Sequence, residues 1–155
     1  MTDAIAPSLT HVTDLFVELD PIMELGRTPA GVRRIIPIIG GRAEGPRLNG
    51  VIENFGADWQ VAGPDGLADI DTRYLLRTDE GALLDIRNPG IRAASPEVTA
   101  RLAAGEVVDP SEYYFRCTPR LFCDHPAHAW VNRRLFVGVG ERRAAEVVMR
   151  IFEIG

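Results

Sequence analysis

The sequence contains no lysine, and all 17 of its basic residues are arginine. This absence excludes chemistry that needs a lysine amine: a Schiff base, attachment of pyridoxal phosphate, and the phosphate-binding lysine of a P-loop. The glycines between Gly40 and Gly45 therefore do not predict a nucleotide-binding loop, and we expect a tight hairpin there. Serine-nucleophile chemistry is also disfavoured, because Ser8, Ser95 and Ser111 lie outside any nucleophile-elbow motif.

Long apolar runs are also missing. No stretch approaches the roughly 20 residues that a membrane-spanning helix requires, and the first residues lack the basic start and apolar block of a secretion signal. We therefore expect a cytoplasmic protein that has no membrane partner. Only two cysteines are present, Cys117 and Cys123, and in that compartment we expect both to be reduced thiols.

A basic stripe is the third absence. The net charge is −5, and the arginines are scattered singly or in pairs such as Arg33–Arg34 and Arg142–Arg143. Because nucleic-acid binding needs clustered positive charge, no nucleic-acid partner is expected. At 155 residues, with 46% hydrophobic and 25% charged residues and no linker-like segment, the composition predicts a single globular domain over residues 1–155.

Short β-rich runs separated by turn signals are what the sequence has in quantity. They predict about ten strands, at 12–18, 31–39, 48–54, 58–62, 67–78, 82–87, 112–118, 128–132, 135–139 and 145–154. The segments Gly63–Gly66 and Asp79–Gly81 predict hairpin turns. One short helix is expected at Pro96–Ala104, because Ser95 can cap it and Gly105 can end it. Since closing the sheet removes its edges, we predict an all-β, closed antiparallel barrel with that helix outside it.

The last predicted strand is apolar on both faces. Val147, Met149 and Ile151 alternate with Val148 and Phe152, whereas a strand with one solvated face alternates apolar and polar residues. The helix or a second copy of the chain would cover its outer face. A homo-oligomer therefore stays open at this stage.

Several runs together resemble one known family. They are Gly40–Pro46, Gly56–Trp59, Asp71–Tyr74, Thr78–Ala82, Tyr113–Arg116 and Ala129–Asn132. In order and spacing, from about Asp14 to Glu153, the chain is similar to the bacterial and fungal domain-of-unknown-function family number 3237. The resemblance implies a closed antiparallel barrel of the general design of allene oxide cyclases and dirigent proteins. It implies no settled activity.

The predicted strand 67–78 carries the first candidate site residues. A period of two places Asp71 and Arg73 on one face, and Tyr74 with its apolar neighbours on the other. If the first face points inward, Asp71 and Arg73 are candidates for catalysis. If it points outward, they form surface ion pairs of little energetic value, and Tyr74 lines the cavity as a substrate-binding residue.

Two further segments carry aromatic and polar residues in the same alternation. Arg116, beside Tyr114, is a candidate clamp for an anionic or carbonyl oxygen. In the predicted strand 128–132, His128, Trp130 and Asn132 share one face. We expect Arg116, Trp130 and Asn132 to converge inside the barrel near Tyr74 or Arg73, because aromatic and planar polar groups together suit a cyclic ligand. His128 is either an acid–base group of this pocket or a hydrogen-bonded histidine at its rim.

Asp58 and Trp59 follow a glycine turn and complete the set of candidates. Asp58 is a candidate general base at the barrel mouth, the alternative being a solvated turn aspartate, and Trp59 is a candidate substrate contact. The segment Cys123–His128 holds thiol and imidazole groups, but its spacing matches no standard zinc motif. We expect no metal and no organic cofactor.

The function that these residues favour is cofactor-independent proton transfer. Carboxylates, arginines and aromatic surface in one cavity suit a lyase, isomerase, hydratase or cyclase acting on a small cyclic or aromatic oxygenated metabolite. The alternative is a carrier that binds such a small-molecule ligand without converting it.

Overall fold

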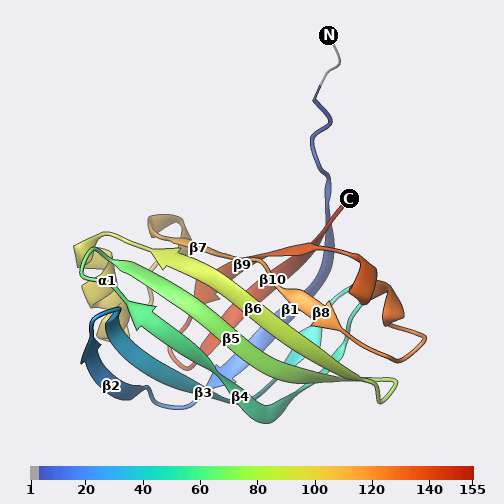
Figure 1. The fold of residues 1–155 in the computed structure, drawn as a ribbon, viewed down its shortest axis with the longest axis horizontal. Helices are drawn as coiled ribbons and strands as arrows, with labels where there is room; N and C mark the ends of the chain where they lie inside the picture. Colours follow the sequence, from blue (N-terminus) through green and yellow to red (C-terminus); the bar gives the residue numbers. More distant parts are fainter. Residues whose placement is uncertain (1–3) are drawn as a thin grey trace.

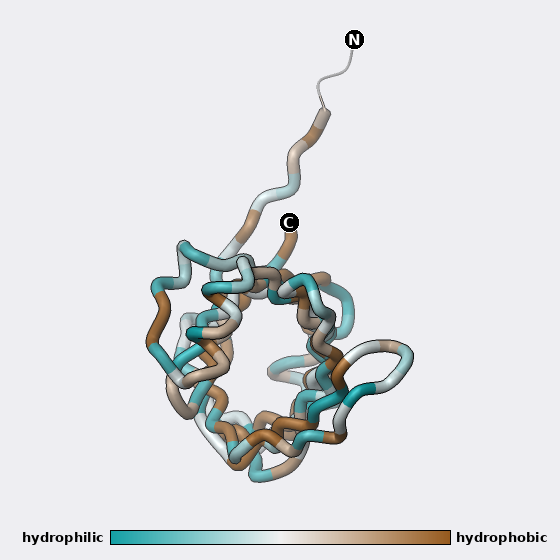
Figure 2. The backbone as a smooth tube through the Cα atoms, turned by 90° about the vertical axis from the view of Figure 1, so that its left-hand side faces the viewer, coloured by the Kyte–Doolittle hydropathy of each residue, from teal (hydrophilic) through white to brown (hydrophobic). Residues whose placement is uncertain are grey.

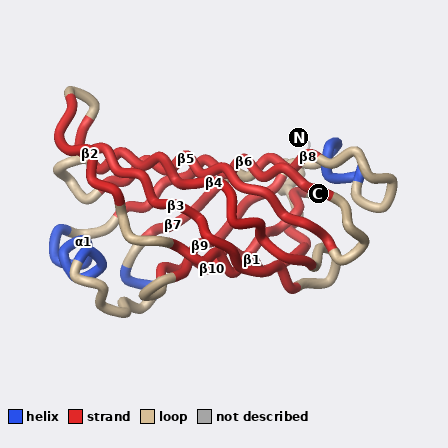
Figure 3. Tube along the Cα trace, turned by 90° about the horizontal axis from the view of Figure 1, so that it is seen from below, coloured by secondary structure: helices blue, strands red, loops and turns tan. Residues whose placement is uncertain are grey.

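Ten β-strands make up most of residues 4–155, the part of the chain described by this computed structural model (Figures 1 and 3). Their bounds are β1 Leu9–Leu19, β2 Met23–Thr28, β3 Gly31–Glu44, β4 Gly50–Ala62, β5 Leu67–Thr78, β6 Leu83–Ala93, β7 Tyr114–Cys117, β8 Arg120–Phe122, β9 Phe136–Arg142 and β10 Glu146–Ile154. The chain also forms helix α1 (Pro96–Ala103) and two 3₁₀ turns, η1 (Pro110–Glu112) and η2 (Ala129–Arg133). No helix within residues 4–155 is long and apolar enough to cross a membrane.

Eight of the described strands close into an antiparallel barrel. Their order is β1-β10-β9-β7-β6-β5-β4-β3, and pairing of β3 with β1 completes the ring. Seen along its axis, the backbone runs round a closed circle (Figure 2). The other two strands lie outside the ring order. Strand β2 pairs antiparallel with the first part of β3, and β8 pairs antiparallel with the first half of β6. The predicted closed barrel is confirmed.

Individual strands differ from their predicted bounds in three ways. The predicted strands 48–54 and 58–62 are one continuous strand, β4, whose register against β5 shifts between Ile52 and Gly56. The predicted strand 128–132 is wrong, because that segment forms the 3₁₀ turn η2. Strands β2 and β8 were not predicted. They are short additions to the edges of longer strands, so hydrogen bonding to those neighbours rather than local sequence defines them.

Gly40 and Gly41 lie inside β3 rather than in the tight hairpin that the sequence predicted. Gly41 has a φ of +130°, and a Cβ atom at this position would lie 1.9 Å from the carbonyl oxygen of Phe16 on β1. A glycine here therefore lets β3 approach β1 closely enough to close the barrel. The hairpin follows later, where Asn49 Oδ1 accepts a hydrogen bond from Gly45 N at 3.0 Å.

Helix α1 forms as predicted, at one end of the barrel (Figure 1). Ser95 Oγ accepts a hydrogen bond from Val98 N at 3.2 Å, and Pro96 occupies the first turn, where its missing N–H costs nothing. Gly105 follows the helix with a φ of +79°. The helix turns Val98 and Leu102 toward the protein interior.

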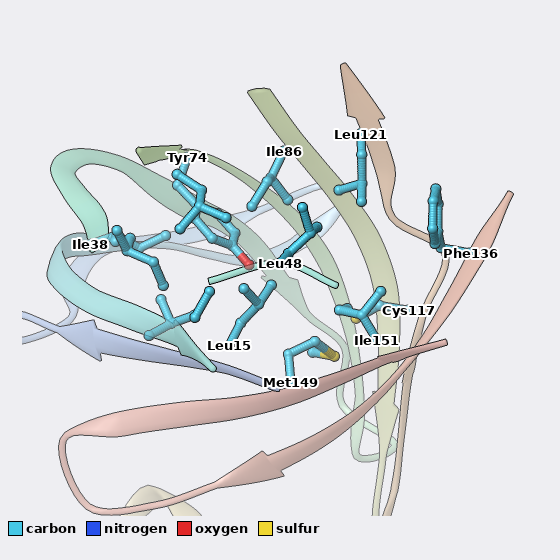
Figure 4. Close-up of a cluster of buried hydrophobic side chains, with 14 of the residues drawn as sticks. Leu15, Ile38, Leu48, Tyr74, Ile86, Cys117, Leu121, Phe136, Met149 and Ile151 are labelled. Atoms are coloured by element: carbon cyan, nitrogen blue, oxygen red, sulfur yellow. The ribbon is translucent and has the colours of Figure 1, made fainter. Parts of the chain in front are cut away.

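Apolar side chains fill most of the barrel interior. Figure 4 shows part of this cluster, in which the labelled side chains converge from opposite sides of the ring. On the outer face of β10, Val148 is fully buried, and its register neighbours are Phe16 on β1 and Glu141 on β9. Arg150 extends along the same face to Glu141, with Nη1 3.2 Å from Oε2. Side chains of the adjacent strands thus cover Val148 on the outer face of β10, whereas Phe152 on the same face is half-buried.

Candidate functional site

The barrel holds a partly polar cavity near the end where α1 and β2 lie. Apolar side chains of β1, β3 and β10 form much of its wall. Its volume of about 40 Å³ exceeds the roughly 10–15 Å³ that one buried water needs. The polar and titratable side chains that line it are Asp58, Gln60, Thr72, Tyr74, Asn88, Arg92, Cys117 and Arg142.

The register of four strands brings the central part of this site together. Asp58 on β4 lies opposite Ile36 on β3 and Thr72 on β5, and Thr72 lies opposite Asn88 on β6. Directly paired residues of neighbouring strands point to the same face of a sheet. These side chains therefore form one row across the inner wall, although they are far apart in the sequence.

Asp58 is the buried carboxyl group of the cavity, with 8% of its surface exposed. Its Oδ1 accepts a hydrogen bond from Asp71 N at 3.1 Å, and its Oδ2 accepts one from Gln60 Nε2 at 3.2 Å. Burial raises the pKa of Asp58 from 3.8 to about 6, against the opposing effect of these hydrogen bonds and of the Arg92 charge. Asp58 thus exchanges its proton close to neutral pH.

Tyr74 and Asn88 present polar atoms that the protein itself leaves unpaired. Tyr74 is 2% exposed and Asn88 is 3% exposed, and neither Tyr74 Oη nor Asn88 Oδ1 has a hydrogen-bond partner within residues 4–155. Figure 4 shows the Tyr74 hydroxyl pointing into the barrel interior. Burial raises the pKa of Tyr74, so its phenol stays protonated near neutral pH. A buried polar atom without a partner is costly, which makes these two atoms the natural contacts of a bound molecule.

Two arginines complete the polar part of the cavity. Arg92 points inward from β6 and Arg142 points inward from the end of β9. Burial, followed by the nearby charges of Arg142 and Arg34, lowers the pKa of Arg92 to about 10, and burial also lowers the pKa of Arg142. Both remain cations at neutral pH. The backbone N–H of Arg142 donates a hydrogen bond to the Tyr113 hydroxyl at 2.9 Å, which fixes the end of β9.

Of the ten candidate residues from the sequence, Asp58 and Tyr74 lie in this cavity. The inward orientation of Asp71 and Arg73 is wrong: β5 turns Ile70, Thr72 and Tyr74 inward, so the alternate residues lie on the outer face. Asp71 still touches the site through its backbone N–H, which donates to Asp58. Trp59 is 43% exposed on the outer face, because its neighbours Asp58 and Gln60 face inward.

Strand β7 has the opposite orientation to the one expected. Phe115 and Cys117 line the cavity, while Tyr114 and Arg116 are exposed on the outside. Arg116 Nη1 donates to the Phe115 carbonyl oxygen at 2.9 Å, and its guanidinium carbon lies 5.1 Å from the centre of the Tyr114 ring. The predicted convergence of Arg116 with Trp130 and Asn132 inside the barrel is therefore wrong.

His128, Trp130 and Asn132 support the loop around η2 instead. His128 Nε2 lies 2.9 Å from Glu80 Oε2 and ties this loop to the β5–β6 hairpin. Asn132 bridges back to Cys123, accepting from its N–H at 3.0 Å and donating to its carbonyl oxygen at 2.6 Å. Trp130 packs against Phe136 and beneath the guanidinium of Arg47, 3.5 Å from the ring centre. These contacts are structural.

The segment Cys123–His128 also held the only metal ligands that the sequence offered as a group. Within residues 4–155, no three His, Cys, Asp or Glu side chains gather in an arrangement that would hold a metal ion. In this loop His125 Nδ1 accepts a hydrogen bond from Ala127 N at 3.1 Å, and His128 contacts Glu80.

Gln60, Thr72, Asn88, Arg92, Cys117 and Arg142 were missing from the sequence-based candidates. A signal for some of them existed in the alternation. Leu84, Ile86 and Asn88 share the inward phase of β6, and Arg92 continues it. A polar residue in the same phase as a run of core residues indicates a polar group that faces the interior. The alternation does not show which of these side chains lie next to one another in the folded protein.

Cys117 gives a direct test of how closed the cavity wall is. Burial raises the pKa of its thiol to about 12 from the ordinary 9.0. In a Cys123→Ser variant we expect the remaining Cys117 to react with a thiol reagent at pH 8 on the order of 1,000-fold more slowly than a free thiol, because so little thiolate is present. Absorbance of the released chromophore measures the rate. Full reaction after unfolding in guanidinium is the control, and rapid labelling of the folded protein would contradict the burial.

The fold and cavity define a small closed antiparallel barrel with a largely apolar interior and a partly polar cavity. The family model described as "Protein of unknown function (DUF3237)" matches residues 7–154, and the chain belongs to this family. A curated relative, the UPF0311 protein RPA1785 of Rhodopseudomonas palustris, is 37% identical over 144 residues, which cover 93% of this chain and 94% of the relative.

Solved structures agree with the barrel. The crystal structure of the conserved protein of unknown function RPA1785 from Rhodopseudomonas palustris has a TM-score of 0.93 at 35% identity, covering 99% of this chain and 100% of that chain. A beta-barrel like protein from Acinetobacter baumannii has a TM-score of 0.87 at 41% identity, with 100% of both chains covered. A structure described as an enzyme from Penicillium herquei has a TM-score of 0.75 at 16% identity, covering 100% of this chain and 99% of that chain. At that identity it shares the fold alone.

Proposed function

We propose that the protein is a cofactor-independent enzyme, an isomerase, lyase, hydratase or cyclase, that uses acid–base catalysis on a small cyclic or aromatic oxygenated metabolite. One observation carries this proposal: a buried carboxyl group with a pKa of about 6, Asp58, shares a cavity with the unpaired hydroxyl of Tyr74. A general acid–base group is most effective when its pKa lies near the working pH.

The roles of the neighbouring groups follow from their chemistry. Asp58 accepts a proton from one atom of the substrate as carboxylate and donates a proton to another as carboxylic acid, so it ends each cycle in the form in which it began. Tyr74 Oη, protonated near neutral pH, donates a hydrogen bond to an oxygen on which negative charge develops. Arg92 and Arg142 add positive charge to the same cavity. The apolar wall excludes water, which strengthens each of these interactions.

The structure from Penicillium herquei, which shares this fold, is described as an enzyme, so the barrel fold is compatible with catalysis. The alternative is a carrier. It would use the same apolar wall and the same unpaired polar atoms to hold a ligand, and Asp58 would then have no proton to move. The test below separates the two.

The test starts with a screen of oxygenated metabolites by thermal shift, because binding to the folded state raises the melting temperature whether or not turnover follows. Each stabilising compound is then incubated with the protein in D₂O and analysed by mass spectrometry. We expect conversion, or exchange of substrate hydrogen for deuterium, in the wild type. Asp58→Asn should lower the rate by about 10²–10⁴-fold, and Tyr74→Phe by about 10²-fold or more.

Arg116→Ala is the matched control, because Arg116 lies on the outer face of the barrel. Its rate should stay within about twofold of the wild type. If every stabilising compound is recovered unchanged and without deuterium, the protein is a carrier and the enzyme proposal is wrong. Conversion that survives Asp58→Asn would remove Asp58 from the mechanism.

A further inference from the structure

The cavity holds more positive charge than the protein neutralises. Neither Arg92 nor Arg142 has a carboxylate oxygen within 4.0 Å in the described part of the chain. Arg34, on β3, reaches only the exposed Glu24 at the rim, with Nε 3.4 Å from Oε1. Arg92 and Arg142 are half-buried, and Arg142 Nε donates to the carbonyl oxygen of Arg143 at 3.2 Å. A cation withdrawn from water is normally paired with a negative charge, so the geometry points to a ligand that brings the missing negative charge.

We propose that the substrate binds through an anionic oxygen group, held by Arg92 and Arg142, and that this anion binds together with a proton on Asp58. This inference rests on the proposed function and names its substrate class, an oxyanion such as a carboxylate. Planar guanidinium groups match planar oxyanions and bind them through charge-assisted hydrogen bonds.

The rest of the cavity indicates how such a molecule would lie. Its anionic end would face Arg92 and Arg142, at the ends of β6 and β9. Its remaining oxygen functions would face the unpaired atoms of Tyr74 and Asn88, which lie farther along the inner wall. Phe115 and Met149 line the same cavity and would contact an apolar or aromatic body. The ligand is therefore amphipathic, charged at one end.

The proton follows from the position of Asp58 among the cavity groups. The hydrogen-bond partners of Asp58, Gln60 and Thr72, are neutral. The nearby arginines, Arg34, Arg92 and Arg142, are cations. Burial keeps Tyr74 and Cys117 protonated near neutral pH. Asp58 is thus the cavity group that changes its charge between pH 5 and 8. A bound anion repels the Asp58 carboxylate, so the anion binds more tightly to the protonated form. By reciprocity, the anion raises the pKa of Asp58.

This coupling has a consequence for the chemistry. When the substrate binds as an anion, Asp58 is a carboxylic acid at neutral pH. The first step is then donation of the Asp58 proton to the substrate, and the resulting carboxylate recovers a proton from the substrate at the end of the cycle. The anion therefore selects the acid form of the group that the proposed function uses.

The experiment is isothermal titration with benzoate and acetate at pH 5.5 and pH 8.0, at constant ionic strength, with benzamide and acetamide as neutral counterparts. We expect saturable binding of at least one carboxylate, about tenfold tighter at pH 5.5, with the matching amide at least tenfold weaker. Arg92→Met and Arg142→Met should each weaken carboxylate binding by tenfold or more. Arg116→Met, on the outer face, should leave it unchanged.

Asp58→Asn separates charge coupling from simple attraction. This variant keeps a neutral group of the same shape, and its carboxylate affinity should be equal at the two pH values and match that of the wild type at pH 5.5. Should the arginine variants fail to fold, NMR titration of the Asp58 carboxyl carbon in the wild type decides the matter: saturating benzoate should raise its pKa.

Amides that bind as well as carboxylates, or a pKa of Asp58 that saturation with the binding carboxylate leaves unchanged, would overturn the inference. Because these measurements involve no turnover, they fail independently of the enzyme proposal. If a neutral metabolite is converted in a reaction that requires Asp58, and no carboxylate binds, the proposed function is retained and the inference of an anionic substrate is wrong.

Discussion

Replacing Asp58 with asparagine should raise the free energy of unfolding by about 3 kcal/mol at pH 8 and leave it nearly unchanged at pH 4. The carboxyl group has a pKa of about 6 in the folded protein and 3.8 in its ordinary state. Its contribution to stability is therefore complete below pH 4 and is lost as the pH rises through 6, because the fold disfavours the charged form. About two pH units correspond to about 3 kcal/mol, which asparagine recovers by staying neutral.

Differential scanning calorimetry at pH 4, 6 and 8 measures this effect. For a chain of this length, 3 kcal/mol corresponds to a rise in melting temperature of roughly 6–12 °C. Asp69→Asn is the matched control: Asp69 is an exposed aspartate of β5, and its replacement should change stability by less than about 0.5 kcal/mol at every pH. A gain for Asp58→Asn of the same size at pH 4 and pH 8 would show that charge burial is not its origin.

Gly41→Ala should destabilise the protein by about 3 kcal/mol or more. The added methyl group would lie 1.9 Å from the carbonyl oxygen of Phe16, and the φ of +130° is itself unfavourable for alanine. Gly41 and Phe16 both lie where β3 pairs with β1, so the two strands must move apart to remove this clash. The barrel loses hydrogen bonds at its closure when they do.

Gly81→Ala serves as the comparison for this variant. Gly81, at the tip of the β5–β6 hairpin, has a φ of +83° and no atom within 4 Å of an added Cβ. It should cost only about 1–2 kcal/mol, the expense of a left-handed backbone for a non-glycine residue. Urea denaturation of both variants gives the difference, which isolates the steric part. Equal losses for the two variants would contradict the close approach of β3 to β1.

The closed barrel and its capped helix could be predicted because their signals are local. The turn at Gly63–Gly66 and the cap at Ser95 both depend on a few neighbouring residues, and both formed as expected. Many hairpins and one short helix leave few alternatives to closure. The register shift of β4 between Ile52 and Gly56 and the close approach of Gly41 on β3 to β1 were not predictable, because both depend on how two strands fit together in space.

The cavity was harder to predict because alternation gives a period but no direction. In β7, aromatic residues occupy both phases, Tyr114 outside and Phe115 inside, so the sequence does not say which phase is buried. Arg92 and Arg142 belong to β6 and β9, which are separated along the chain by the helix, two 3₁₀ turns and strands β7 and β8. Their meeting depends on strand order and register, which long-range pairing determines. Tyr74 was found because it shares the phase of its strand's core-facing residues. Asp58 was found for a different reason, as a residue after an expected glycine turn at the barrel mouth, whereas it lies buried within β4.

The pairing of β1 with β10 bears on how this protein folds. Leu9 lies opposite Ile154, so residues from the two ends of the described chain must meet before the ring is complete. Closing so long a loop loses chain entropy early and recovers contact energy late, and proteins with such distant pairings fold in milliseconds to seconds rather than microseconds. While the ribosome is still adding β10, β1 has only β3 as its partner. The other edge of β1 stays open until β10 has been made and has paired with it, and the lumen that contains Asp58 stays open with it.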